Sequence, residues 1–195
     1  KKMLSYEESL KILKETNALI DGHFILSSGL HSSQYIQCAK LLSNPGKAKS
    51  ICQSLAEKIE NNFKNIDIIL SPAMGGIIIG YEIAKILKVK AIFSEREKNY
   101  FILRRNFEIP KKSNVLIVED VITTGKSSLE CSKIIKDSSA NILGYACIID
   151  RSNNKSLIKD KIISQIKINI PTFDNNNIPK ELLNIKAIKP GSRKI

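Results

Sequence analysis

The sequence has no apolar run near the roughly 20 residues that a membrane-spanning helix needs. It also lacks the apolar start of a secretory signal peptide, so we expect a cytoplasmic protein that does not contact a membrane. Its four cysteines, Cys38, Cys52, Cys131 and Cys147, are scattered and show no paired metal-ligand spacing. We therefore expect buried free thiols in a reducing compartment.

The chain also lacks internal repeats and any linker long enough to separate two domains. Its 195 residues suffice for a full hydrophobic core, so we expect a single domain over residues 1–195. The net charge is +12, but the basic residues are spread along the whole chain. Nucleic-acid binding calls for a clustered basic surface, so we expect no nucleic-acid partner and interpret the excess of Lys and Arg as a compositional bias. The charge would still attract polyanionic small substrates.

The most informative stretch covers residues 115–127. Four apolar residues predict a buried strand that runs into Glu119 and Asp120, and a turn rich in hydroxyls and Gly leads to a helix expected over 128–137. Carboxylates accept hydrogen bonds from sugar hydroxyls, and the free N–H groups of a first helical turn hold phosphate. The pattern predicts a ribose-phosphate site; the alternative is a generic strand-turn-helix with a solvated acidic tip.

The end of this stretch, Gly125-Lys126-Ser127, is similar to the end of a Walker A loop. That loop requires a Gly five positions before its second Gly, and this chain has Asp120 there. A carboxylate at that position would repel a triphosphate. We therefore exclude a nucleotide-binding P-loop.

Strands alternate with helices from residue 66 onward, which predicts an α/β fold with a mainly parallel central sheet flanked by helices. The expected strands cover residues 66–70, 89–93, 115–118, 142–149 and 162–170. The expected helices cover residues 5–20, 47–63, 77–87, 128–137 and 179–183. We place the core at about 44–170 and assign about 1–40, with the C-terminal tail, to a small hood.

Two further segments bear on function. Residues 23–38 predict two short strands around a Ser/Gly turn, and residues 94–110 predict a charged insertion with a hairpin over 101–110. Ligands of parallel sheets bind at the carboxyl ends of the strands, where the acidic pair lies. Gly75 and Gly76 follow the strand over 66–70, which predicts that a pyrophosphate approaches the backbone there; the alternative is close packing of the helix on the strand.

The hydrophobic strand, acidic pair and Thr-Thr-Gly-x-Ser turn of residues 115–127 resemble the phosphoribosyl-diphosphate (PRPP) motif of the type I phosphoribosyltransferases. Other segments resemble the orotate-specific branch of that family, namely residues 28–37, 72–76, 95–97, 103–105, 150–151 and 189–193. The resemblance implies the type I fold and transfer of the 5-phosphoribosyl group from PRPP to orotate in pyrimidine biosynthesis. It also implies a homodimer and Mg²⁺ held mainly by PRPP oxygens, without direct side-chain ligation.

The same resemblance implies residue roles. It assigns PRPP binding to Glu119, Asp120, Val121, Ile122, Thr123, Thr124, Gly125, Lys126, Ser127, Gly75 and Gly76. It assigns orotate binding to Thr123, Arg151, Ser28 and Gly29. Arg96, closing over the diphosphate, and Asp120 take the catalytic roles, and Lys98, Arg104 and Arg105 are alternatives to Arg96. No histidine is needed, so His23 and His31 are expected to be structural.

The chain departs from the family pattern at two lysines, since Ser27 and Gly75 stand where many members carry Lys. The charged insertion over 94–110 also lacks the Lys-x-His ending that is familiar in the family. Two alternatives stay open: a phosphoribosyltransferase acting on uracil or a purine, and a PRPP-sensing regulator without turnover. The regulator would need a clustered basic surface or an added helix-turn-helix, and the N-terminal segment has neither.

Overall fold

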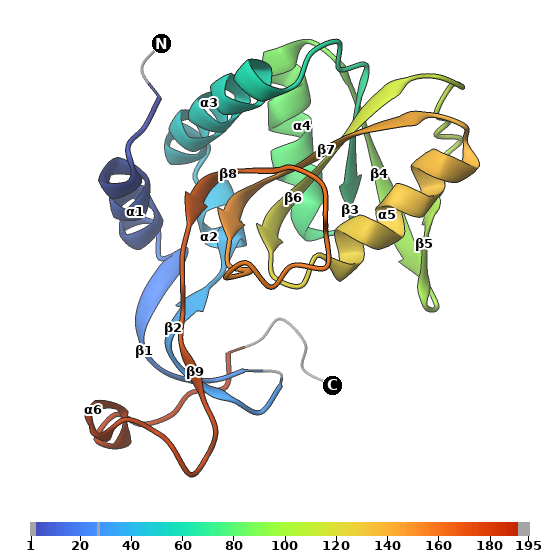
Figure 1. Cartoon of the computed structure of the whole chain (residues 1–195). Coiled ribbons are helices and arrows are strands. Elements are labelled where there is room, and N and C mark those ends of the chain that lie inside the picture. Colours follow the sequence, from blue (N-terminus) through green and yellow to red (C-terminus); the bar gives the residue numbers. More distant parts are fainter. Residues whose placement is uncertain (1–2, 27, 191–195) are drawn as a thin grey trace.

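A computed structural model describes residues 3–26 and 28–190. Its main sheet has the strand order β5-β4-β3-β6-β7-β8, and neighbours are parallel except for the antiparallel edge pair β4–β5 (Figure 1). The strands are β3 (Ile68–Pro72), β4 (Lys90–Glu97), β5 (Tyr100–Leu103), β6 (Asn114–Ile122), β7 (Asn141–Asp150) and β8 (Ile162–Lys167). The mainly parallel α/β sheet predicted from the sequence is confirmed.

Helices cover both faces of this sheet. Helices α3 (Pro45–Asn62) and α4 (Gly75–Leu87) pack on one face, and α5 (Lys126–Asp137) packs on the other (Figure 1). The strand over 115–118 is therefore fully buried, as its unbroken run of apolar residues indicates. Each large side chain in such a position contributes about 1.5–3 kcal/mol of burial free energy, which makes β6 a rigid support for the residues that follow it.

Helix α1 (Tyr6–Glu15) begins with the capping box that the sequence indicates, because Ser5 and Glu8 bond each other's backbone N–H groups. The helix is shorter than the expected 5–20. Asn17 adopts a left-handed conformation with φ of 55°, which reverses the chain after the helix. Leu19 then begins β1 instead of continuing the helical face.

The hood is a separate antiparallel sheet of β1 (Leu19–Ile25), β2 (His31–Ile36) and β9 (Thr172–Phe173). The hairpin predicted over 23–38 is confirmed. The short helix α2 (Cys38–Leu42) follows β2, and α6 (Lys180–Leu183) follows β9. His23 Nε2 lies 2.6 Å from His31 Nδ1, and His23 Nδ1 lies 2.9 Å from the Ile185 carbonyl. The histidines thus join the hairpin to the C-terminal segment, in agreement with a structural role.

The hairpin expected over 101–110 is wrong. Strand β4 continues to Glu97, the chain turns at Lys98 with φ of 52°, and β5 pairs back onto β4. After β5, Arg105 and Asn106 both have positive φ, so the chain leaves the sheet there. The helix expected from residue 47 begins at Pro45, because Asn44 caps it instead of breaking the chain. The strand expected over 162–170 ends at Lys167.

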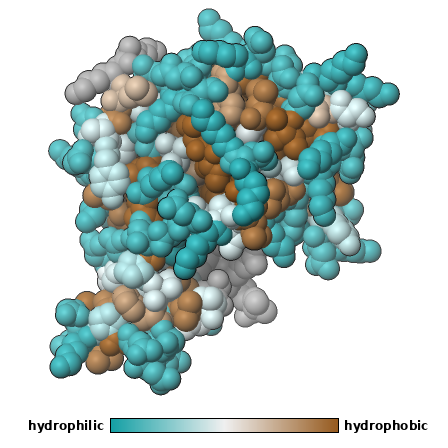
Figure 2. Space-filling view, viewed as in Figure 1, coloured by the Kyte–Doolittle hydropathy of each residue, from teal (hydrophilic) through white to brown (hydrophobic). Residues whose placement is uncertain are grey.

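All four cysteines are free and buried, as expected. Within residues 3–26 and 28–190, no helix is both long and apolar enough to cross a membrane. Hydrophilic residues cover most of the visible surface, and apolar residues show between them over the middle of the sheet (Figure 2).

Candidate active site

The carboxyl ends of three neighbouring strands meet at one edge of the main sheet. The parallel register pairs Leu70 of β3 with Ile117 of β6, and Ile122 of β6 with Asp150 of β7. Consequently the turn before α4, the turn before α5 and the residue after β7 lie at the same edge (Figure 1). The acidic pair precedes the end of the central strand, β6.

Helix α5 begins at this edge without a side-chain cap. Its N-cap residue is Gly125, whose φ of 78° is a left-handed conformation that favours glycine. Space also demands glycine, because a Cβ there would lie 2.7 Å from Ile158 Cδ1. Leu157 N–H donates to the Thr124 carbonyl at 2.8 Å and so holds the turn from outside. The first-turn N–H groups and the positive end of the helix dipole form an anion site.

Helix α4 begins beside it, again without a side-chain cap, and Gly75 and Gly76 are its first two residues. A Cβ at Gly76 would lie 3.1 Å from the Val118 carbonyl, so this glycine lets the helix pack against β6. A Cβ at Gly75 would lie 2.7 Å from Asp120 Oδ2. Any side chain at position 75, lysine included, would therefore displace the Asp120 carboxylate.

The acidic pair lies between these two helix starts. Glu119 is only 9% exposed, and burial raises its pKa to about 7 even though the Ser128 hydroxyl donates a hydrogen bond to its carboxylate. Burial also raises the pKa of Asp120, opposed by a 2.9 Å hydrogen bond from the Val121 N–H. Among the described residues, neither carboxylate has a cationic partner. Two uncapped helix N-termini, each suited to binding an anion, thus flank two carboxylates that lack counter-charges among the described residues.

Arg151 follows β7 and reaches the same edge. Its backbone N–H donates to the Ile122 carbonyl at 2.9 Å, which ties it to the end of β6. The side chain is half-buried, and desolvation lowers its pKa, although a guanidinium stays charged at neutral pH. No acceptor in the described part of the chain bonds this guanidinium. A half-buried, unpaired cation fits a planar anionic ligand.

Arg96, predicted to close over the diphosphate, is engaged elsewhere. Its guanidinium bonds Glu130 of α5 at 2.6 Å and stacks 4.2 Å over the Phe101 ring. Reaching a diphosphate would require Arg96 to share or leave Glu130, and its role stays a prediction. Of the alternatives, Arg104 pairs with Glu97 at 2.6 Å and Arg105 with Glu95 at 3.0 Å.

The hood residues assigned to orotate are less closely tied to this edge. Ser28 and Gly29 are exposed, and their hydrogen bonds stay within the β1–β2 turn. In Figure 1 this turn lies below the carboxyl edge of the main sheet. Thr123 and Thr124 are exposed in the turn before α5. Ser27 and residues 191–193 of the tail motif lie outside the described residues.

Comparison with known proteins decides the family. The family described as phosphoribosyl transferase domain matches residues 39–183. An orotate phosphoribosyltransferase of Parvibaculum lavamentivorans is 47% identical over 193 residues, covering 98% of this chain and 100% of that protein. One from Methylorubrum extorquens is 45% identical over 188 residues, covering 96% of each. This chain belongs to the phosphoribosyltransferase family.

The fold agrees with membership of this family. The crystal structure of orotate phosphoribosyltransferase from Aeropyrum pernix matches with a TM-score of 0.71 at 22% identity, covering 81% of this chain and 92% of that one. This chain therefore has the type I phosphoribosyltransferase fold, and the resemblance to orotate phosphoribosyltransferases inferred from its motifs is confirmed.

Sequence reasoning missed three neighbours of the site. Ser128 was expected only as the first residue of a helix, yet its hydroxyl bonds Glu119. Glu130 holds Arg96, and the segment at Leu157 and Ile158 covers the turn at Gly125. No pattern in the sequence links residues 30 or more positions apart, so only Ser128, adjacent to the motif, had a local signal.

Proposed function

We propose that this protein transfers the 5-phosphoribosyl group from PRPP to orotate, giving orotidine 5′-phosphate and pyrophosphate in pyrimidine biosynthesis. The observation that carries the proposal is the placement of Glu119 and Asp120 between the uncapped N-termini of α4 and α5. PRPP has a 5-phosphate and a 1-diphosphate, separated by a ribose with two free hydroxyls. Along this edge, two helix N-termini suited to anions are likewise separated by two hydrogen-bond-accepting carboxylates. Near full-length identity to orotate phosphoribosyltransferases supports orotate as the acceptor.

In this proposal the 5-phosphate binds the turn over 123–127, and the diphosphate binds at Gly75 and Gly76. The carboxylates of Glu119 and Asp120 accept hydrogen bonds from the ribose hydroxyls. Because Gly75 has no side chain, the diphosphate can approach the backbone beside Asp120. The three subsites hold one flexible ligand in an extended conformation, which removes much of the entropy cost of reaching the reactive geometry.

Orotate is planar and carries a carboxylate, so we assign that carboxylate to Arg151. The guanidinium offers a pair of parallel N–H donors, and its partial burial strengthens the ion pair. Thr123, in the turn before α5, is proposed to hydrogen-bond the pyrimidine, and Ser28 and Gly29 to cover it from the hood. Arg151 and the hood residues are thus proposed for orotate alone, whereas Thr123 lies in the turn that the two substrates share.

We also propose Mg²⁺ as the cofactor. The described residues contain no cluster of three or more potential metal ligands; in our proposal, oxygens of PRPP hold the ion. The uncompensated carboxylates of Glu119 and Asp120 fit a cation on this side of the ribose. Bound Mg²⁺ would stabilise charge on the leaving pyrophosphate.

Displacement at the anomeric carbon then needs no nucleophilic side chain. As the family resemblance implies, the transition state has oxocarbenium character, so positive charge develops on the ribose ring. The carboxylates of Glu119 and Asp120 lie on a rigid strand and need little reorganisation to stabilise that charge. Arg96 would stabilise the opposite charge on the diphosphate.

Turnover of orotate tests the proposal. We expect the absorbance of orotate to fall when PRPP and Mg²⁺ are added together, and no change when either is omitted. Uracil, adenine and hypoxanthine are the matched controls. Turnover with one of these and none with orotate would contradict the assignment, and PRPP binding without turnover of any base would favour the regulator.

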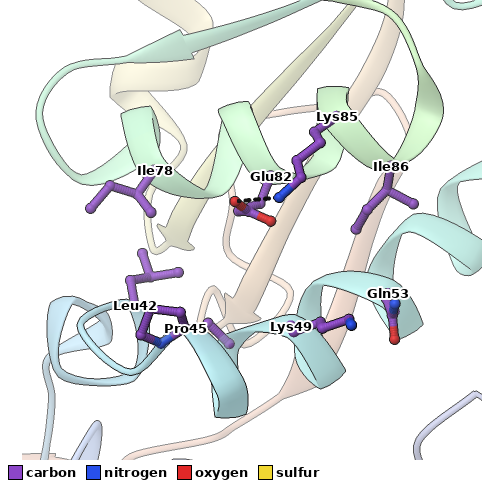
Figure 3. A pocket seen from close by; sticks show the side chains of 9 residues that line it. Leu42, Pro45, Lys49, Gln53, Ile78, Glu82, Lys85 and Ile86 are labelled. Atoms are coloured by element: carbon purple, nitrogen blue, oxygen red, sulfur yellow. Dashed lines mark ion pairs between the residues drawn. The ribbon is translucent and has the colours of Figure 1, made fainter.

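We propose that two copies associate through the outer face of α4. Ile78 and Tyr81 on this face are 52% and 61% exposed. A groove of about 410 Å³ continues from Ile78 between α3 and α4, with Leu42 and Pro45 on one side and the Lys85–Glu82 ion pair on the other (Figure 3). An apolar strip rimmed by opposite charges suits a self-complementary contact.

The oligomeric state of Tyr81→Glu tests this surface. We expect the wild type to sediment as a dimer and Tyr81→Glu as a monomer, because a charge in an apolar contact loses its hydration. Tyr100→Glu makes the same change at another exposed tyrosine, on β5, and should stay dimeric. A monomeric wild type, or equal behaviour of both variants, would rule out this interface.

The cytoplasm is the proposed location, since four free buried thiols suit a reducing compartment.

A further inference from the structure

Ser128 is fully buried in the first turn of α5, one residue beyond the turn proposed to bind the 5-phosphate. A buried hydroxyl is costly unless it is hydrogen-bonded, and serines within helices commonly bond a carbonyl of the preceding turn. Ser132, one turn later, does so by donating to the Leu129 carbonyl at 2.7 Å. Ser128 instead donates to Glu119 Oε2 on a different element.

This bond is the only one that Glu119 receives from a side chain in the described part of the chain. Within the described residues, the ionisable groups that interact electrostatically with Glu119 are acidic: Asp120 beside it on β6, Glu130 and Cys131 on α5, and Cys147 on β7. Arg96, which contacts α5, is paired with Glu130. Among the residues that the structure describes, the Ser128 hydroxyl is thus the one side-chain group that both orients the Glu119 carboxylate and favours its ionised form.

We propose that Ser128 is a positioning residue for PRPP, which holds the Glu119 carboxylate toward the ribose hydroxyls. Because Ser128 belongs to the first turn of α5, the same bond ties the ribose subsite to the 5-phosphate subsite. If loss of the 5-phosphate displaced α5, the hydrogen bond from Ser128 would move the Glu119 carboxylate with the helix. The inference rests on the proposed function, since it assumes that Glu119 binds the ribose of PRPP.

Ser128→Ala tests the inference, with Ser132→Ala as the matched control on the same buried side of α5. We expect Ser128→Ala to raise the KM for PRPP roughly tenfold, as for loss of a charged hydrogen bond, and to leave the KM for orotate nearly unchanged. The acid limb of kcat/KM for PRPP should move to higher pH by about half a unit, because the ionised Glu119 loses its donor. Ser132→Ala should change neither.

Two further measurements separate positioning from general destabilisation. In a Glu119→Gln background, Ser128→Ala should have little additional effect on PRPP, since its partner's charge is already gone. Ser128→Thr keeps the hydroxyl and should retain the wild-type pH profile. A Ser128→Ala variant whose KM for PRPP and pH profile match those of Ser132→Ala, or whose effect adds fully to that of Glu119→Gln, would overturn the inference.

Calorimetric binding of Mg²⁺–PRPP distinguishes failure of this inference from failure of the proposed function. Binding of PRPP does not depend on which base accepts the ribose. If the wild type binds PRPP but turns over no orotate, the proposed function fails while weakened binding by Ser128→Ala still supports the inference. If orotate is turned over and Ser128→Ala binds PRPP as the wild type does, the inference fails alone.

Discussion

Asp120→Asn is expected to lower kcat/KM for PRPP by roughly 100-fold or more. A hydrogen bond to a charged group contributes about 1.5–3 kcal/mol, and each ~1.4 kcal/mol is tenfold in affinity. The variant also loses the negative charge that faces the developing positive charge on the ribose. The measurement is steady-state kinetics with PRPP varied at saturating orotate, and the KM for orotate should change much less.

The fold should tolerate this change. The Val121 N–H that donates to Asp120 Oδ1 can donate equally to an amide oxygen, so the melting temperature should stay close to that of the wild type. Asp137→Asn, at the exposed end of α5, makes the same substitution away from the site and should be fully active. An unchanged rate in Asp120→Asn would remove the ribose assignment.

Proton binding gives this prediction a second test. Burial raises the pKa of Asp120, and it raises that of Glu119 to about 7. A carboxyl with a raised pKa is protonated until the pH exceeds that value, so PRPP use should fall as the pH falls below neutral. Mg²⁺ bound together with PRPP would counteract the effect of burial and move the acid limb of the pH profile to lower pH in the complex. In Asp120→Asn, the fall in kcat/KM for PRPP at acidic pH should no longer contain the contribution from protonation of Asp120.

Arg151→Ala is expected to raise the KM for orotate roughly 30- to 100-fold, as for loss of a bidentate charged hydrogen bond of about 2–3 kcal/mol. The KM for PRPP should change less than about threefold, because Arg151 is assigned to the base alone. Arg151→Lys should recover only part of the loss, since an ammonium keeps the charge without the planar pair of donors.

Lys167→Ala is the matched control for this variant. The Lys167 ammonium lies 3.9 Å from the carboxylate of Asp150, and Asp150 directly precedes Arg151 in the chain. The Lys167 side chain is largely exposed. Its removal takes a positive charge from the same neighbourhood and should barely affect orotate, because exposed charges are well screened. Equal losses for orotate and PRPP in Arg151→Ala would refute the carboxylate assignment.

Local patterns determined much of this protein. The apolar run before Glu119 specified a buried strand, because a strand covered on both faces has no reason to alternate. The turn at Gly125 specified the start of α5, because few other residues accept its backbone conformation. Alternation of such units implied a parallel sheet, and a parallel sheet brings successive strand ends to one edge. The family and the edge that carries the site therefore followed from the sequence.

Only the tertiary structure decided how these parts meet. The contact between Gly75 and Asp120 joins residues 45 positions apart, and it shows that a side chain at position 75 would have to displace the Asp120 carboxylate. The bonds from Ser128 to Glu119 and from Arg96 to Glu130 likewise depend on how α5 packs against β6 and β4. The ends of α1 and β5 were misjudged because left-handed residues at Asn17, Arg105 and Asn106 reverse the chain without a glycine. Periodicity reveals which face of an element is buried, but the partner across the interface is set by packing of the whole chain.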